Sequence, residues 1–196
     1  MSAPGLNHES EIKLALPDAA AGRKLLRRHG FRLYRRRVLE RNLVFDQPDG
    51  ELRAGGRLLR LRTVGRRSIL TFKGPPLPSR HKLREEIETE IPDPDAFELI
   101  LRRLGYQVTF RYEKYRAEYR EPGGRGTATL DETPIGVFLE LEGPSDWIDS
   151  TAGRLGYSDA DYITESYGAL YLAHCRRGSI APTHMVFPVP GTTDSK

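Results

Sequence analysis

Cysteine is nearly absent from this chain of 196 residues, where Cys175 is the only example. A single thiol cannot form a disulfide within the chain, so the sequence excludes a disulfide-stapled fold and fits a reducing compartment. Long apolar runs are absent as well, because no stretch approaches the ~20 residues needed to span a bilayer. Residues 1–6 carry neither the basic nor the apolar region of a secretory signal. We therefore expect a cytoplasmic protein that does not enter a membrane.

Histidine is also scarce, and the five histidines are not spaced as a metal-binding cluster. Charge, by contrast, is abundant: 31 Lys and Arg residues stand against 27 Asp and Glu residues, which gives a formal net charge of +4 and a pI near 9.3. Hydrophobic residues make up 38% of the chain, which is typical of a globular protein. The mildly basic balance favours an anionic partner, and nucleic acid, nucleotide and polyphosphate all fit it.

Hydrophobic periodicity divides the chain into short strands and a few helices. Alternation of apolar and polar residues predicts strands at 6–16, 31–46, 57–64, 67–74, 82–91, 106–120, 127–131 and 137–142. Helical spacing predicts helices at 19–29, 93–104, 145–155 and 164–175. This pattern indicates one α+β domain over residues 1–175 with a mostly antiparallel sheet. Residues 176–196 are rich in proline and lack an apolar face, so we expect a disordered tail there.

Charged residues gather on one face of most predicted strands, because residues two apart on a strand share a face. The shared faces carry Glu9, Glu11 and Lys13; Arg60 and Arg62; Thr71 and Lys73; Arg84, Glu86, Glu88 and Glu90; Lys114 and Arg116; and Glu140 and Glu142. An ordinary sheet with one wet face would also alternate, but it usually mixes both signs of charge. Here like charges recur in pairs, and they repel each other unless something lies between them.

A closed barrel explains the pattern if the charged faces point inward. The basic pairs would then bind phosphate oxygens, and the acidic pairs would bind hard cations through oxygen ligands. Burying unpaired ions without a ligand is costly, so we expect a water-filled, open tunnel when no ligand is bound. Removing one lumen cation should relieve repulsion in that state. A barrel for an apolar ligand is disfavoured, because the inward positions are charged.

The same segments resemble the CYTH family, which is named after class IV adenylyl cyclase and thiamine triphosphatase and belongs to the triphosphate tunnel metalloenzymes. The family hallmark Glu-x-Glu-x-Lys stands at residues 9–13. It is a weak signal alone, but further segments follow in the family's order: LRLR at 59–62, LTFKGP at 70–75, REEIE at 84–88, EKYR at 113–116, LD at 130–131 and FLELEG at 138–143. Within the family, the chain looks most like the class IV adenylyl cyclase branch.

The resemblance implies a closed eight-stranded antiparallel β-barrel, a triphosphate tunnel, with helices packed outside. The triphosphate ligands that it implies are Lys13, Arg60, Arg62, Lys73, Arg84, Lys114 and Arg116. The metal-facing carboxylates that it implies are Glu9, Glu11, Asp131, Glu140 and Glu142, with Glu86 and Glu88 as weaker candidates. The catalytic residues that it implies are Lys13, Lys73, Lys114 and Glu140. The expected ion is Mg²⁺ or Mn²⁺, because carboxylate and phosphate oxygens are hard donors.

Two reactions fit such a site. One is hydrolysis of an inorganic or organic triphosphate, and the other is cyclisation of ATP to cyclic AMP and pyrophosphate by a class IV adenylyl cyclase. Both need the same alignment and neutralisation of the phosphates, so inorganic triphosphate, ATP and thiamine triphosphate all stay open as substrates. A module that binds polyphosphate or phosphorylated RNA without turnover would not need the acidic pairs, which disfavours nucleic acid as the partner. The sequence leaves a homodimer open.

Overall fold

The computed structural model describes residues 7–188, with side chains from Ser10 onward. Its strands are β1 (Asn7–Leu16), β2 (Arg32–Asp46), β3 (Leu58–Val64), β4 (Arg67–Lys73), β5 (Lys82–Glu90), β6 (Gln107–Arg120), β7 (Thr127–Thr133) and β8 (Gly136–Glu142). They form a closed antiparallel barrel in the order β1-β5-β4-β3-β2-β6-β7-β8. The first strand closes the barrel by pairing with both β5 and β8. The predicted eight-stranded barrel is confirmed.

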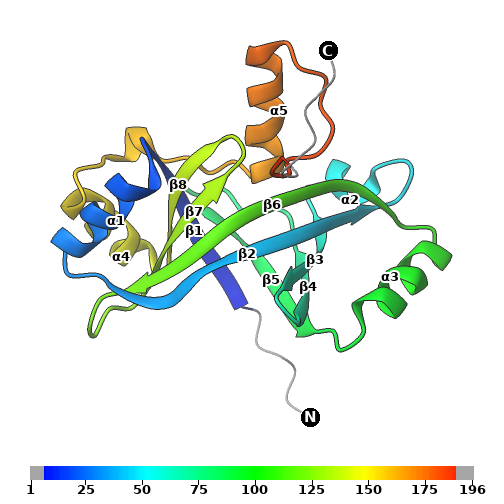
Figure 1. The fold of residues 1–196 in the computed structure, drawn as a ribbon, viewed down its shortest axis with the longest axis horizontal. Helices are drawn as coiled ribbons and strands as arrows, with labels where there is room; N and C mark the ends of the chain where they lie inside the picture. The colour runs from blue at the N-terminus through cyan, green and yellow to red at the C-terminus, as the bar shows by residue number, and fades with distance from the viewer. Residues whose placement is uncertain (1–6, 189–196) are drawn as a thin grey trace.

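The helices lie outside the barrel (Figure 1). They are α1 (Ala19–Arg28), α2 (Glu51–Ala54), α3 (Pro94–Arg103), α4 (Ser145–Arg154) and α5 (Tyr167–Gly178), with a 3-10 turn at Asp159–Asp161. Side-chain caps fix three helix starts, because Asp18, Asp93 and Ser166 each accept a hydrogen bond from a backbone N–H of the first turn. Between residues 7 and 188, no helix combines the length and the apolar character that a bilayer crossing requires.

The short helix α2 was not predicted, because only a chain break was visible at residues 47–50. Its position depends on Asp46, the last residue of β2. The Asp46 carboxylate accepts hydrogen bonds from the backbone N–H groups of Leu52 at 2.9 Å and Arg53 at 3.0 Å. These bonds satisfy N–H groups that a helix start leaves without a partner. One buried carboxylate therefore turns the break into a helical turn.

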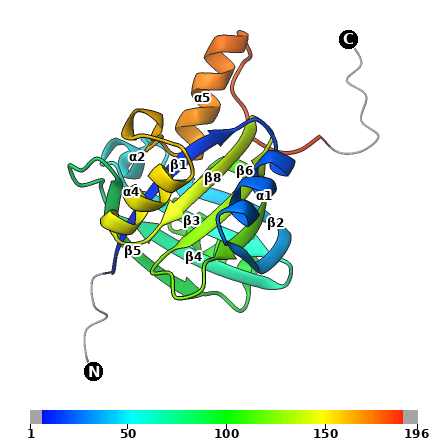
Figure 2. The ribbon, with the colours of Figure 1, turned by 90° about the vertical axis from the view of Figure 1, so that its left-hand side faces the viewer.

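The main hydrophobic core lies between the outer face of the barrel and the helices α1 and α4, which lie on the side that faces the viewer in Figure 2. Ile12 and Leu14 of β1, Leu139 and Leu141 of β8, and Ile148 of α4 have no exposed surface. Because neighbouring strand residues point to opposite faces, this packing turns the charged residues between them toward the barrel interior. The core thus sits outside the barrel and leaves its lumen polar.

The segment after α5 packs against β6. Only the C-terminal half of β6 pairs with β7, so the backbone before it is open on that side. Met185 occupies this edge: its N–H donates to the Arg111 carbonyl at 3.0 Å, and its carbonyl accepts from the Glu113 N–H at 2.8 Å. The Met185 side chain is fully buried. The prediction of a disordered tail is therefore wrong for residues 176–188, and its remainder, 189–196, lies outside the described residues.

Candidate functional site

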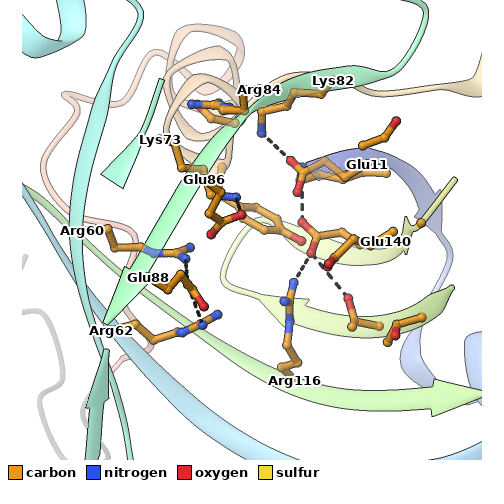
Figure 3. A pocket seen from close by; sticks show the side chains of 18 of the residues that line it. Glu11, Arg60, Arg62, Lys73, Lys82, Arg84, Glu86, Glu88, Arg116 and Glu140 are labelled. Carbon is orange, nitrogen blue, oxygen red and sulfur yellow. Dashed lines mark hydrogen bonds and ion pairs between the residues drawn. The ribbon is translucent and has the colours of Figure 1, made fainter. Parts of the chain in front are cut away.

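The barrel encloses a charged cavity of about 1110 Å³, and every strand helps to line it. All of the predicted triphosphate ligands line this cavity: Lys13, Arg60, Arg62, Lys73, Arg84, Lys114 and Arg116. Figure 3 shows charged side chains from opposite walls pointing into the same space. The alternation of charge along the strands therefore identified the inward faces correctly.

The predicted metal-facing carboxylates are placed less uniformly. Glu11, Glu140 and Glu142 line the cavity. Asp131 does not line it and is fully buried. The Glu9 side chain lies outside the described residues, although its backbone pairs with Arg84 of β5. The structure thus brings at least three of the five carboxylates to the cavity.

Two arginines of β3 offer hydrogen-bond donors to the lumen. Arg60 donates through Nη1 to the Tyr112 hydroxyl at 3.2 Å and through Nη2 to Thr71 Oγ1 at 3.1 Å. Arg62 donates through Nη2 to Glu88 Oε1 at 3.2 Å. The Nε atoms of both arginines are buried and have no hydrogen-bond partner among the described residues. Both side chains line the cavity, where guanidinium N–H groups can donate to phosphate oxygens.

Lys13 lies between two carboxylates. Its Nζ is 3.2 Å from Glu11 Oε1 and 3.2 Å from Glu140 Oε1. Burial disfavours the charged form of all three groups, but their mutual attraction outweighs it. The pKa of Lys13 is raised above its ordinary value, and the pKa values of Glu11 and Glu140 are held well below theirs. All three side chains are therefore ionised at neutral pH.

A second cluster surrounds Asp131 on β7. Lys114 Nζ lies 2.8 Å from Asp131 Oδ2, and Arg116 Nε lies 2.7 Å from Asp131 Oδ1. The Tyr167 hydroxyl, from the first residue of α5, donates to Asp131 Oδ2 at 2.7 Å. Arg116 also bonds to Glu140, which joins this cluster to Lys13. Burial opposes the charge on Arg116, but Asp131 and Glu140 raise its pKa well above the ordinary value.

Lys82 is a lumen residue that the sequence reasoning missed. Its Nζ donates to Glu11 Oε1 at 2.5 Å, and the side chain lines the cavity. Burial and the nearby charge of Lys13 lower the pKa of Lys82 to about 8, although Glu11 opposes this shift. Lys82 is two residues before Arg84 on β5, so the alternation rule that selected Arg84 could have found it.

Glu40 and Tyr167 were missed as well. Glu40 stands directly opposite Lys114 in the β2–β6 ladder, and its Oε2 lies 3.7 Å from Lys114 Nζ. Burial raises the pKa of Glu40, but Lys114 and the surrounding arginines outweigh it and lower the pKa below the ordinary value. Glu40 shares a strand face with Asn42, so alternation was its available signal. Charge patterning could not reveal Tyr167, which is uncharged and lies at the start of a helix.

Opposite charges on neighbouring strands compensate the like charges within each strand. Lys73 Nζ of β4 lies 2.9 Å from Glu86 Oε2 of β5. Across the intervening β4, Arg62 Nη2 of β3 lies 3.2 Å from Glu88 Oε1 of β5. The expectation that only a ligand or water would separate like charges is thus corrected, because the register of the barrel supplies counter-charges.

The carboxylates of the cavity fit a hard metal ion that binds together with a phosphate. The described residues include no group of three or more His, Cys, Asp or Glu side chains arranged around a common metal position. Glu11 and Glu140 nevertheless both face the cavity, and Glu142 stands directly opposite Glu11 in the β1–β8 ladder. Mg²⁺ in proteins is usually held by one or two carboxylates plus phosphate oxygens and water. The donor set therefore suits Mg²⁺ or Mn²⁺ carried by a triphosphate.

Residues 7–167 match the CYTH domain. A protein of Methanocaldococcus jannaschii, provisionally named an adenylate cyclase, is 30% identical over 135 residues, which span 68% of this chain and 75% of that protein. The extent of these matches shows that the chain belongs to the CYTH domain family. The resemblance inferred from the ordered motifs is confirmed.

Solved structures share the barrel. The X-ray structure of a provisionally named adenylate cyclase from Vibrio parahaemolyticus has a TM-score of 0.71 and 21% identity, and the match covers 84% of this chain and 97% of that one. A Hippeastrum protein provisionally named an adenylyl cyclase, and described as having a dominant triphosphatase activity, has a TM-score of 0.60 and 23% identity over 89% and 97% of the two chains. At these identities the likeness establishes the fold alone.

Proposed function

We propose that this chain is a divalent-metal-dependent enzyme that hydrolyses a triphosphate inside the barrel. The cavity carries the proposal, because it brings cations from β1, β3, β4, β5 and β6 to one space beside Glu11 and Glu140. A triphosphate is a compact polyanion, and charge-assisted hydrogen bonds to its oxygens are among the strongest in proteins. Membership of the CYTH family supports the same substrate class.

The cations have distinguishable roles in this proposal. Arg60 and Arg62 line the cavity and would donate guanidinium N–H groups to the phosphate chain. Lys73, Lys114 and Arg116 would neutralise the charge that spreads over the phosphoryl oxygens in the transition state. Each of these three lines the cavity.

The acidic side of the cavity completes the proposed site. Glu11 and Glu140 would hold Mg²⁺ or Mn²⁺, with Glu142 and Glu9 as further ligands, and the bound ion would polarise phosphoryl oxygens as a Lewis acid. Lys13 lies between the two buried carboxylates and favours their ionised forms. A module that only binds polyanions would gain nothing from carboxylates at these positions, which favours an enzyme.

Cyclisation of ATP is the second candidate. The Methanocaldococcus jannaschii relative favours it by its provisional name, whereas the Hippeastrum neighbour has a dominant triphosphatase activity. The aromatic side chains that line the described cavity are Tyr112 and Tyr167. Both are buried, and both hydroxyls are already bonded to protein side chains. Neither presents an open face on which an adenine could stack, so hydrolysis is the better supported reaction.

The test is to incubate the purified protein with inorganic triphosphate, ATP or thiamine triphosphate in Mg²⁺, Mn²⁺ or a chelator, and to separate orthophosphate, pyrophosphate and cyclic AMP. We expect metal-dependent release of orthophosphate. Cyclic AMP with pyrophosphate would establish the cyclase instead. Tight triphosphate binding with no product under any condition would favour the binding module.

A cytoplasmic location and a homodimer also stay predictions.

A further inference from the structure

The Asp131 carboxylate accepts four hydrogen bonds from protein donors. Oδ1 accepts from Arg116 Nε, and Oδ2 accepts from Lys114 Nζ, from Arg116 Nη2 and from the Tyr167 hydroxyl. The side chain has no exposed surface and lies behind the cavity wall. A metal ion at Asp131 would compete with Lys114 and Arg116 for its oxygens, and a cation displaced from it would lie buried without its counter-charge.

The donors on Asp131 are themselves cavity residues. Arg116 stands directly opposite Asp131 in the β6–β7 ladder, and Lys114 is its neighbour on the same face of β6. Both Lys114 and Arg116 line the cavity. Asp131 therefore holds two cations that border the space for the substrate. A long flexible lysine gains a fixed position from such an anchor at the cost of its side-chain entropy.

Tyr167 fixes the same cluster from the opposite side. Its ring centroid lies 5.2 Å from Lys13 Nζ and 4.9 Å from Lys114 Nζ, so both ammonium groups contact the ring face. The ring packs edge-on against Phe138 at 5.7 Å between centroids. Burial and the neighbouring Asp131 raise the pKa of Tyr167 well above its ordinary value, so the hydroxyl stays a neutral donor. Because Tyr167 begins α5, this helix reaches into the wall of the site.

We infer that Asp131 and Tyr167 are positioning residues that orient Lys114, Arg116 and Lys13 toward the phosphate chain, and that Asp131 is not a metal ligand. This inference rests on the proposed function for its substrate. It assigns Asp131 a different role from the one that the family resemblance implied. Glu11 and Glu140 face the cavity directly and remain the carboxylates for the metal.

The experiment compares Asp131→Asn, Tyr167→Phe and Glu140→Gln. It measures the Mg²⁺ concentration that gives the half-maximal rate, the KM for inorganic triphosphate, and triphosphate binding in chelator by calorimetry. For Tyr167→Phe we expect KM to rise and metal-free affinity to fall by about tenfold, at an unchanged Mg²⁺ midpoint, because one hydrogen bond to a charged group is lost. For Asp131→Asn we expect a lower rate with the Mg²⁺ midpoint unchanged, whereas Glu140→Gln should raise that midpoint.

Tyr171→Phe is the matched control, because Tyr171 is a buried tyrosine of the same helix whose hydroxyl contacts Thr183 and which does not line the cavity. It should bind triphosphate like the wild type. A tenfold higher Mg²⁺ midpoint for Asp131→Asn would make Asp131 a metal ligand and overturn the inference. A Tyr167→Phe variant with the KM and the metal-free triphosphate affinity of the wild type would also overturn the inference. If Asp131→Asn does not fold, the Tyr167→Phe variant decides the question alone.

A failure of the proposed function would look different. The wild type would then release no product from any triphosphate, and the inference would be tested by calorimetry alone. Weaker triphosphate binding by Tyr167→Phe, with Mg²⁺ binding by Asp131→Asn equal to the wild type, would still support it. Equal triphosphate binding by Tyr167→Phe, or Mg²⁺ binding lost in Asp131→Asn, would overturn it.

Discussion

Lys73 and Glu86 face each other across the β4–β5 ladder, with 2.9 Å between Nζ and Oε2 and about a tenth of each side chain exposed. A predicted substrate ligand is thus also a structural counter-charge in the ligand-free barrel. Any substitution of such a residue acts on binding and on stability together.

We predict that Lys73→Met lowers both turnover and the free energy of unfolding. Breaking a buried pair costs about 3 to 5 kcal/mol, and we expect the lower end because Glu86 borders a polar cavity. This reverses the expectation that losing a lumen cation relieves repulsion. Denaturant unfolding and steady-state rates measure the two effects. The double variant Lys73→Met, Glu86→Gln should recover stability without activity, and a single variant as stable as the wild type would show that the pair does not matter.

Glu140→Gln should separate metal binding from anion binding. The pKa of Glu140 lies well below its ordinary value despite burial, because Arg116, Lys114 and Lys13 surround the carboxylate, so the substitution removes a full negative charge at neutral pH. We expect metal-dependent turnover to fall at least tenfold, while triphosphate affinity in chelator holds or improves. Calorimetry with and without Mg²⁺, beside product formation, tests this. Full metal-dependent activity in the variant, or equal wild-type turnover in chelator, would remove the acidic side from the site.

Triphosphate affinity in metal-free buffer should fall as the pH rises from 7 to 9. The pKa of Lys82 is lowered to about 8 by burial and by Lys13, so the cavity loses a cation in this range. The effect on stability has the opposite sign: an unfolded lysine titrates near pH ~10.4, so between about 8 and 10 the unfolded chain binds more protons and the contribution of Lys82 to stability rises with pH. Lys82→Arg keeps its charge and controls for titration of the phosphate. If the triphosphate affinity of Lys82→Arg falls with pH as steeply as that of the wild type, Lys82 is not the titrating group.

Met185→Ala should destabilise the protein even though Met185 does not line the cavity. Its side chain is fully buried, and truncating a buried methionine costs about 2 to 5 kcal/mol. For a chain of this size each kcal/mol corresponds to about 2 to 4 °C in melting temperature. Val186→Ala is the matched control, because Val186 is 42% exposed. Equal melting temperatures for both variants would contradict the packing of this segment.

Alternation carried most of the fold and much of the site from the sequence alone. It predicted the eight strands and the inward direction of side chains such as Arg60 and Lys114, because period-two patterning is a local property. It could not pair Lys73 with Glu86 or Glu40 with Lys114, since those contacts depend on the register between strands. The β2–β6 ladder shows why, because its bulges near Arg35 and Val44 shift the pairing in ways that no local pattern records.

The contacts that α5 and the segment after it make with the barrel could not be predicted from local patterns either, for a different reason. Tyr167 and Met185 are uncharged residues whose roles come from partners far along the chain. The prolines after residue 176 indicate only that no regular helix or strand continues. They do not exclude an extended segment that satisfies the open edge of β6. Composition therefore predicted disorder where tertiary hydrogen bonds decide the outcome.

The barrel closes only when β1 pairs with β8, so folding requires a contact between the first and the last described strands. During synthesis β1 emerges before the other described strands, whereas its β8 partner at residues 136–142 is the last of them to be made. Until then β1 keeps an open edge, and such edges can pair with other chains. Contacts between distant segments also slow folding, because loop-closure entropy must be lost first. Glu11 and Lys13 face the lumen in the folded barrel. Until β1 pairs with β8, these charges would disfavour pairing of its open edge with other chains.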